Sequence, residues 1–101
     1  MVRALSLKDL WDGDKVGLEI EGQKILLVRL DGEVHAFEDR CCHLGLPLSP
    51  GRMSDGLLTC PIHEWQYDAR TGRGVNPTHV RLCQCKVEIK NGDIYVDVKG
   101  A

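Results

Sequence analysis

Short runs in which hydrophobic and polar residues alternate fill most of the chain, and turn residues separate these runs. Two of them, ILLVRL at 25–30 and EVHAF at 33–37, flank Asp31-Gly32. A two-residue Asp-Gly link needs positive φ at both positions and is typical of a type I′ turn. The pattern therefore predicts a β-hairpin over 25–37.

Two further links follow the same rule. KVEIK at 86–90 and DIYVDV at 93–98 flank Asn91-Gly92, and VGLEI and QKILL flank Glu21-Gly22. Strands about ten residues apart, with turns between them, predict an all-β fold of the small antiparallel β-sandwich or barrel type. Only 5–13 has the pattern of a helix, and that helix would be short.

The segment 38–80 differs from its flanks. It holds all four prolines and five of the eleven glycines, a density that interrupts regular structure and predicts bent loops. We expect this loop-rich subdomain to carry the chemistry. A chain of 101 residues is the size of one domain, so 1–101 is predicted to be a single domain with a thin core.

Charge and hydropathy exclude two kinds of partner. The formal net charge is −2, and the Lys and Arg residues form no run, whereas nucleic-acid binding usually needs a basic patch. No stretch approaches the roughly 20 apolar residues that span a bilayer, and no apolar secretion signal opens the chain. We expect a cytoplasmic protein that binds neither nucleic acid nor membrane, with modest electrostatic steering.

Two mixed pairs of cysteine and histidine stand out within the loop-rich segment. Cys41 and His43 are separated by one residue, Cys60 and His63 by two, and sixteen residues lie between the pairs. In a reducing compartment such cysteines are metal ligands or core residues more often than disulfides. Mixed nitrogen and sulfur ligands suit a soft, borderline metal.

Three kinds of site are compatible with these residues. A structural Cys₂His₂ zinc site is one, although zinc sites usually pair Cys with Cys and His with His. A thiol nucleophile, Cys60 with His63 as its base, is another, but no orienting third group is evident. A two-iron cluster explains the mixed pairs better, because each pair can reach one iron with its Cys and the other with its His.

The residues around the two pairs resemble those of a known family. CHLGLPLS, then LLTCPIHEW and YDARTG, are similar to the Rieske 2Fe-2S proteins, and the likeness extends to the closing NGDIYVDVKG. With TGRGVNP, the chain most resembles the ferredoxin components of toluene and benzene multicomponent monooxygenases. The resemblance implies one 2Fe-2S cluster held by four ligands: Cys41, His43, Cys60 and His63. Cys42 would fill the variable position, and Pro77 would lie in a third loop over the cluster.

The function implied by this resemblance is transfer of one electron, without catalysis by the chain itself. An NADH-dependent flavin reductase would load a monomeric carrier, and the di-iron hydroxylase component of an aromatic-hydrocarbon monooxygenase would accept the electron. The chain has no nucleotide-binding fingerprint and is too short for a helical di-iron bundle. The alternatives are the ferredoxin of an aromatic-ring dioxygenase, a redox sensor with the same cluster, and a zinc-based interaction module.

The same resemblance implies a docking tip and a low redox potential. The histidine-bound iron would lie at the tip, with Leu44, Leu46 and Trp65 around it. High-potential relatives have a disulfide at the positions of Leu46 and Ile62, and a serine at the position of Trp65; only their tyrosine is kept, as Tyr67. We expect a midpoint in the lower half of the range of about −150 to +300 mV.

The remaining cysteines and histidines are expected to have structural roles. Cys83 and Cys85 are two positions apart on a predicted strand, so they should share one face as small core or half-buried side chains. His35 is expected at the surface of a hairpin. His79, near Pro77, is expected to be inert or to lie near the cluster.

Overall fold

The computed structural model describes residues 1–41, 47–61 and 64–98. Within them, strands and turns dominate, as the all-β prediction requires. The elements are β1 (Val2–Ser6), η1 (Leu7–Asp9), β2 (Lys15–Ile20), β3 (Gln23–Leu30), β4 (Glu33–Glu38), β5 (Arg52–Ser54), β6 (Leu57–Thr59), β7 (Gln66–Asp68), β8 (Gly74–Asn76), β9 (Gln84–Cys85), β10 (Val87–Lys90) and β11 (Asp93–Val96). The helix expected within 5–13 is a single 3₁₀ turn, η1.

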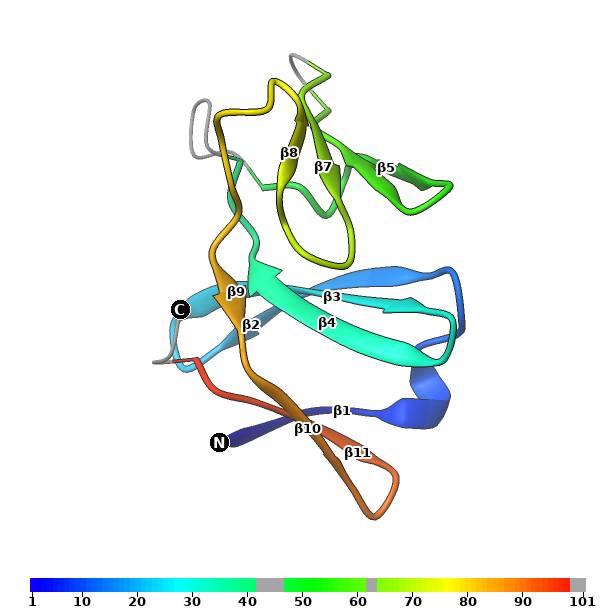
Figure 1. The fold of residues 1–101 in the computed structure, drawn as a ribbon. Helices are drawn as coiled ribbons and strands as arrows, with labels where there is room; N and C mark the ends of the chain where they lie inside the picture. The colour runs from blue at the N-terminus through cyan, green and yellow to red at the C-terminus, as the bar shows by residue number, and fades with distance from the viewer. Residues whose placement is uncertain (42–46, 62–63, 99–101) are drawn as a thin grey trace.

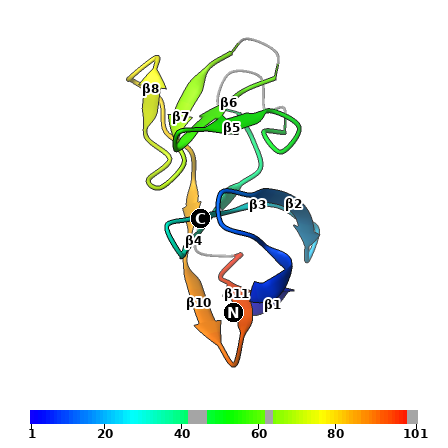
Figure 2. The same ribbon diagram turned by 90° about the vertical axis from the view of Figure 1, so that its right-hand side faces the viewer.

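The strands form three antiparallel sheets. Their orders are β1-β11-β10, β2-β3-β4-β9 and β5-β6-β7-β8. Figures 1 and 2 show them as three tiers, with the sheet of β2, β3 and β4 in the middle and the sheet of β5 to β8 at one end. The segment 39–83, called the insertion below, connects β4 to β9, which are neighbours in the middle sheet.

The predicted turns have the predicted backbone. Asp31 and Gly32 have φ of 53° and 79°, and Asn91 and Gly92 have 51° and 77°. Glu21-Gly22 behaves alike. Asp55-Gly56, between β5 and β6, is a fourth turn with both φ positive. Sequence analysis missed it because its flanking strands have only three residues each, too few to show alternation.

Strand β3 is buried on both of its faces. Leu26 and Val28 contribute to a core shared with the insertion, and Ile25 and Leu27 to a core shared with β1 and β11. Successive side chains of a strand point to opposite sides, so the unbroken apolar run 25–28 supplies both cores at once. The alternation predicted for the last hairpin also holds for Ile94 and Val96, both fully buried.

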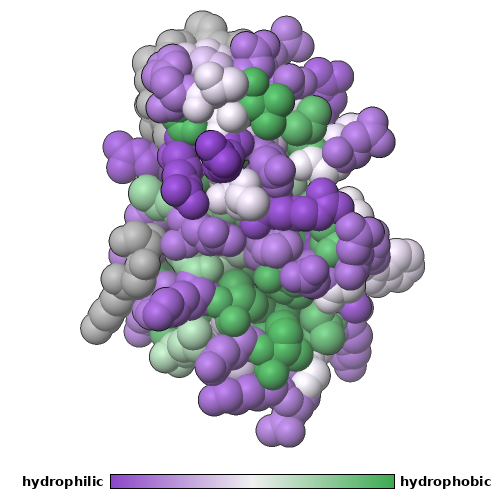
Figure 3. All heavy atoms as spheres, in the orientation of Figure 1, coloured by the Kyte–Doolittle hydropathy of each residue, from purple (hydrophilic) through white to green (hydrophobic). Residues whose placement is uncertain are grey.

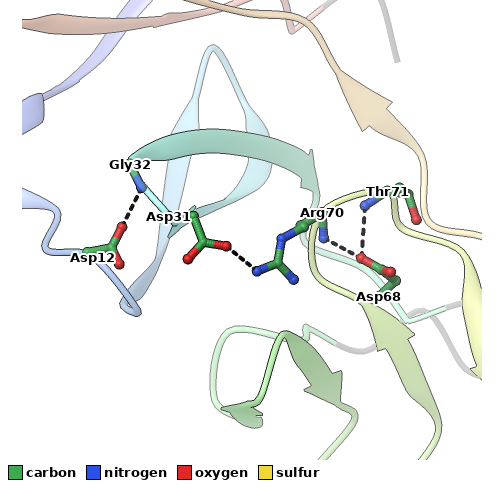
Figure 4. A network of polar contacts seen from close by, with 6 residues as sticks. All are labelled: Asp12, Asp31, Gly32, Asp68, Arg70 and Thr71. Carbon is green, nitrogen blue, oxygen red and sulfur yellow. Dashed lines mark hydrogen bonds and ion pairs between the residues drawn. The ribbon is translucent and has the colours of Figure 1, made fainter.

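Polar contacts join the insertion to the middle sheet (Figure 4). The guanidinium of Arg70, in the turn after β7, lies 2.6 Å from the carboxylate of Asp31, in the turn after β3. On the other side of the same turn, the backbone N–H of Gly32 donates to Asp12 at 2.6 Å, which joins the turn to the segment before β2. Arg70 and Asp31 are well exposed, so the pair orients the two units more than it stabilises them.

A groove lies away from the paired cysteines. It has a volume of about 560 Å³ and runs between β4 and β10, where its lining includes Met1, Val34, His35 and Val87. Figure 3 shows hydrophobic side chains gathered on this lower half of the molecule. His35, expected at the surface, is half-buried on this wall. In the described part of the chain, no helix is long and apolar enough to cross a membrane.

Candidate metal centre

The two cysteines of the predicted site lie in one core. The exposed fraction of Cys41 is 1% and that of Cys60 is 2%, and both belong to the core that the insertion shares with β3. Cys41 follows β4, and Cys60 follows β6. The fold therefore brings one Cys of each mixed pair into the same apolar environment. His43, His63 and Cys42 lie outside the described residues, as do Leu44 and Leu46.

A buried tyrosine lies beside the first cysteine. Tyr67, on β7, is fully buried, and its Oη is 3.3 Å from Cys41 Sγ. A thiolate has no proton to give, so in a metal-bound state the phenol O–H is the donor. Buried thiolates are costly unless a cation and hydrogen bonds compensate them. Two buried Cys residues and one buried O–H donor therefore fit a site that holds a metal through sulfur.

The loop between β6 and β7, called the second loop, closes tightly around Cys60. The N–H of Cys60 donates to the carbonyl of Trp65 at 2.8 Å, and the N–H of Glu64 donates back to the carbonyl of Cys60 at 3.2 Å. Glu64 has a positive φ of 57°. Gly51 lies so close to this region that a Cβ there would be 2.0 Å from the carbonyl oxygen of Thr59. Thr59, just before Cys60, thus packs directly against Gly51, just before β5.

A buried carboxylate closes the first loop, which connects β4 to β5. Asp39 is 6% exposed, and its Oδ1 accepts the N–H groups of Leu48 at 2.6 Å and Ser49 at 2.9 Å. Its own N–H donates to the carbonyl of Lys24 at 2.9 Å. Asp39 thus fixes both ends of the loop to the middle sheet. Sequence analysis missed this residue because an acidic residue after a strand usually lies in an exposed turn, and no local motif marks it as buried.

The loop between β8 and β9, called the third loop, packs against the second loop. Trp65 is half-buried on the core that holds both cysteines, and its ring meets that of His79 edge to face, with centroids 6.4 Å apart. His79 is exposed, and a cis peptide bond joins Asn76 to Pro77 in the same loop. The loop that contains Pro77 thus packs beside Trp65, next to the core that contains Cys41 and Cys60.

Comparisons with known proteins settle the family. The model of the Rieske [2Fe-2S] domain matches residues 1–89. The chain belongs to the Rieske [2Fe-2S] domain family. Rieske domains hold one 2Fe-2S cluster, with two cysteines on one iron and two histidines on the other. The resemblance noted in the sequence is thus confirmed, and so is the cofactor that it implied.

Individual Rieske relatives come from several oxygenase systems. The chain is 32% identical over 96 residues to the ferredoxin component of the alkene monooxygenase system of Xanthobacter autotrophicus, covering 94% of this chain and 79% of that one. It is 28% identical over 98 residues to the ferredoxin component of the Pseudomonas putida naphthalene 1,2-dioxygenase system, covering 96% and 94%. The solved ferredoxin of carbazole 1,9a-dioxygenase from Nocardioides aromaticivorans superposes with a TM-score of 0.85 at 26% identity, over 94% of each chain.

The expectation that Cys83 and Cys85 are both core or half-buried side chains is wrong for Cys83. Cys85 is 4% exposed, whereas Cys83, just before the two-residue strand β9, is exposed. Burial, followed by the nearby charge of Glu38, raises the pKa of the Cys85 thiol to about 11. Cys85 is therefore a protonated core residue of this Rieske domain. The described residues include no group of three His, Cys, Asp or Glu that would hold a second metal.

Asp39→Ala tests the closure of the first loop. Removing the carboxylate leaves the buried N–H of Leu48 and the partly buried N–H of Ser49 without their acceptor, so we expect a loss of about 1–3 kcal/mol in the free energy of unfolding. Urea denaturation of the iron-loaded protein measures this loss. Asp39→Asn is the matched control, because its amide oxygen can accept the same two bonds. Equal losses in both variants would contradict the role of these bonds.

Tyr67→Phe tests the hydrogen bond to sulfur. A donor to a cysteine ligand stabilises the additional negative charge of the reduced state, so its loss lowers the midpoint potential. A bond that differs by about 1.4 kcal/mol between oxidation states corresponds to roughly 60 mV for one electron. Protein-film voltammetry is expected to show a wild-type midpoint below zero and a variant midpoint lower by about this amount. An unchanged midpoint would show that the 3.3 Å contact does not act on the cluster.

Proposed function

We propose that the chain is a one-electron carrier whose cluster is bound by Cys41, His43, Cys60 and His63. The observation that carries this assignment is the burial of Cys41 and Cys60 in one core, with Tyr67 Oη beside Cys41 Sγ. Each buried Cys begins a short pair that ends in a His. The spacing of the pairs within the Rieske pattern supports the two histidines as the remaining ligands.

The carrier role is supported by the relatives and by what the chain's own residues do. The relatives above are named ferredoxin components of oxygenase systems. The cluster supplies a site for one electron. Around it, Tyr67 donates a hydrogen bond, the core side chains exclude water from the two sulfurs, and the loop of His79 packs over Trp65. The electron itself would enter and leave on the side of His43 and His63.

We infer the partners from the chemistry of such systems. An NADH-dependent flavin reductase would load the carrier, and the di-iron hydroxylase of an aromatic-hydrocarbon monooxygenase would accept the electron, with the chain acting as a cytoplasmic monomer. The likeness to an alkene monooxygenase ferredoxin supports monooxygenase service. The likeness to naphthalene and carbazole dioxygenase ferredoxins supports a second candidate, service to an aromatic-ring dioxygenase.

Four single substitutions test the ligand assignment. Cys41→Ser, His43→Ala, Cys60→Ser and His63→Ala are each expected to lose the cluster and much of the fold, since metal binding contributes folding free energy. Iron content and electron paramagnetic resonance of the dithionite-reduced protein report the outcome; the wild type should give a Rieske-type spectrum. Cys42→Ser is the control and should retain iron. Retention in Cys41→Ser with loss in Cys42→Ser would refute the assignment.

Reconstitution tests the role of the carrier and separates the two oxygenase classes. The purified chain is combined with NADH, a flavin reductase, and either a di-iron hydroxylase or a ring-hydroxylating dioxygenase, chosen from the genomic neighbourhood of its gene. We expect NADH-dependent product with the di-iron hydroxylase, and only when the chain is present. Product with the dioxygenase alone would favour the second candidate. No electron transfer to either oxygenase would refute the carrier role.

A further inference from the structure

Ser49, at the exit of the first loop, is held by two side chains of opposite charge. Its backbone N–H donates to Asp39 Oδ1 at 2.9 Å. Its carbonyl oxygen accepts a hydrogen bond from the ammonium of Lys15, on β2. At Cys60, by contrast, the second loop is closed by bonds between backbone groups. The two charges at the first loop therefore ask for an explanation beyond loop closure.

Strand β2 packs directly on the carboxylate and on the exit of the loop. Lys15 and Gly17 are two positions apart on this strand, so they face the same side of the sheet. A Cβ at Gly17 would lie 2.6 Å from Ser49 Oγ and 3.0 Å from Asp39 Oδ2. Such a close approach needs a residue without a side chain. The carboxylate of Asp39 is thus enclosed by β2 and the first loop, and it is 6% exposed.

The same carboxylate is joined to the proposed cluster site in two ways. Asp39 comes two residues before Cys41, so their Cα atoms are at most about 7 Å apart. Asp39 Oδ1 also accepts the N–H of Leu48 at 2.6 Å, and Leu48 packs in the core that contains both Cys41 and Cys60. Lys15, which is half-buried, reaches the loop one residue later, at Ser49. Both charges therefore lie next to the residues that hold the cysteines.

Two other cations near Asp39 are in contact with water. Lys24 and Arg40 line a groove together with Asp39, and both are exposed. In the described part of the chain, neither forms an ion pair with Asp39. Salt and water screen exposed charges strongly and buried charges much less. Of these charged groups, Asp39 is therefore the least screened, and Lys15 comes next.

We propose that Asp39 and Lys15 set the midpoint potential of the cluster, the buried carboxylate lowering it and the ammonium raising it. Reduction adds one electron, and hence one negative charge, to the cluster. A fixed negative charge nearby opposes that electron, and a fixed positive charge favours it. Because Asp39 is the more deeply buried of the two, their net effect is a lower potential. The proposal rests on the cluster site proposed above and adds the residues that tune it.

Asp39→Asn tests the negative charge. The amide oxygen still accepts the two backbone N–H groups, so the charge is removed while both bonds are kept. Protein-film voltammetry at neutral pH is expected to show that the equilibrium constant for reduction rises about tenfold, which is roughly 60 mV for one electron. Glu88→Gln is the matched control, because it removes an exposed carboxylate from β10, at the opposite end of the molecule from β5 to β8 (Figure 1). An Asp39→Asn midpoint equal to or below that of the wild type would overturn the proposal.

Lys15→Met tests the positive charge and should act in the opposite direction. Methionine keeps an unbranched stem on β2 and removes the ammonium, so we expect the equilibrium constant for reduction to fall about threefold, on the order of 30 mV. Lys90→Met, on β10, is its control and should leave the midpoint unchanged. If Asp39→Asn does not retain iron, this pair of variants decides alone. An unchanged or higher midpoint in Lys15→Met would then refute the assignment.

Gly17→Ala separates the effect of charge from the effect of loop position. The added Cβ must displace Ser49 or Asp39 without changing any charge. We expect a lower melting temperature and a midpoint shift smaller than that of Asp39→Asn. A shift as large as that of Asp39→Asn would show that the position of the loop sets the potential, and would overturn the role of the charges.

Electron paramagnetic resonance of the reduced protein gives a second criterion. The g values of Asp39→Asn should match those of the wild type, because the ligands keep their places while the midpoint moves. A change in g values together with the midpoint would again point to loop position and count against the proposal. None of these measurements needs a redox partner. A wild type that binds no 2Fe-2S cluster is instead failure of the proposed cluster site, and a wild type that binds one but transfers no electron to an oxygenase is failure of the carrier role.

Discussion

The burial of β3 on both faces is the constraint on which the rest of the structure depends. Its run of four apolar residues cannot be covered by a single neighbouring layer. One face needs the strands at the two ends of the chain, and the other needs the insertion. Because the insertion is required to complete a core, the two cysteine-bearing loops are held against a rigid strand, and the core positions Cys41 and Cys60 as part of the same packing.

Specific polar contacts then refine what packing begins. Asp39 fixes the ends of the first loop through three backbone bonds, and the Arg70–Asp31 pair orients the far side of the insertion. These contacts differ in kind. The Asp39 contact is buried and contributes to stability, since its loss leaves backbone N–H groups without an acceptor. The second is exposed, where an ion pair is weak and mainly selects one orientation.

Much of this architecture could be predicted from sequence, and the reasons for the failures are physical. Asp31-Gly32 and Asn91-Gly92 specify their turns locally, so both hairpins can be predicted from the sequence. The paired Cys and His spacing identifies the family, because ligation restricts spacing severely. Asp39 could not be found, since its role depends on backbone groups nine and ten residues away. The different exposures of Cys83 and Cys85 depend on where β9 begins, which tertiary contacts decide.

The pairing of β4 with β9 gives the insertion a modular character. Phe37 and Gln84 are register partners, so the chain leaves and re-enters the middle sheet at points about one strand spacing apart, near 5 Å. Such closely spaced ends allow the loops of the insertion to change length at a small entropic cost, as long as the side chains that cover Leu26 and Val28 are kept. The pairing of Phe37 with Gln84 thus allows the ends of the chain and the loops of the insertion to change independently. The ends of the chain can vary for stability, while the insertion can vary for redox chemistry and partner choice.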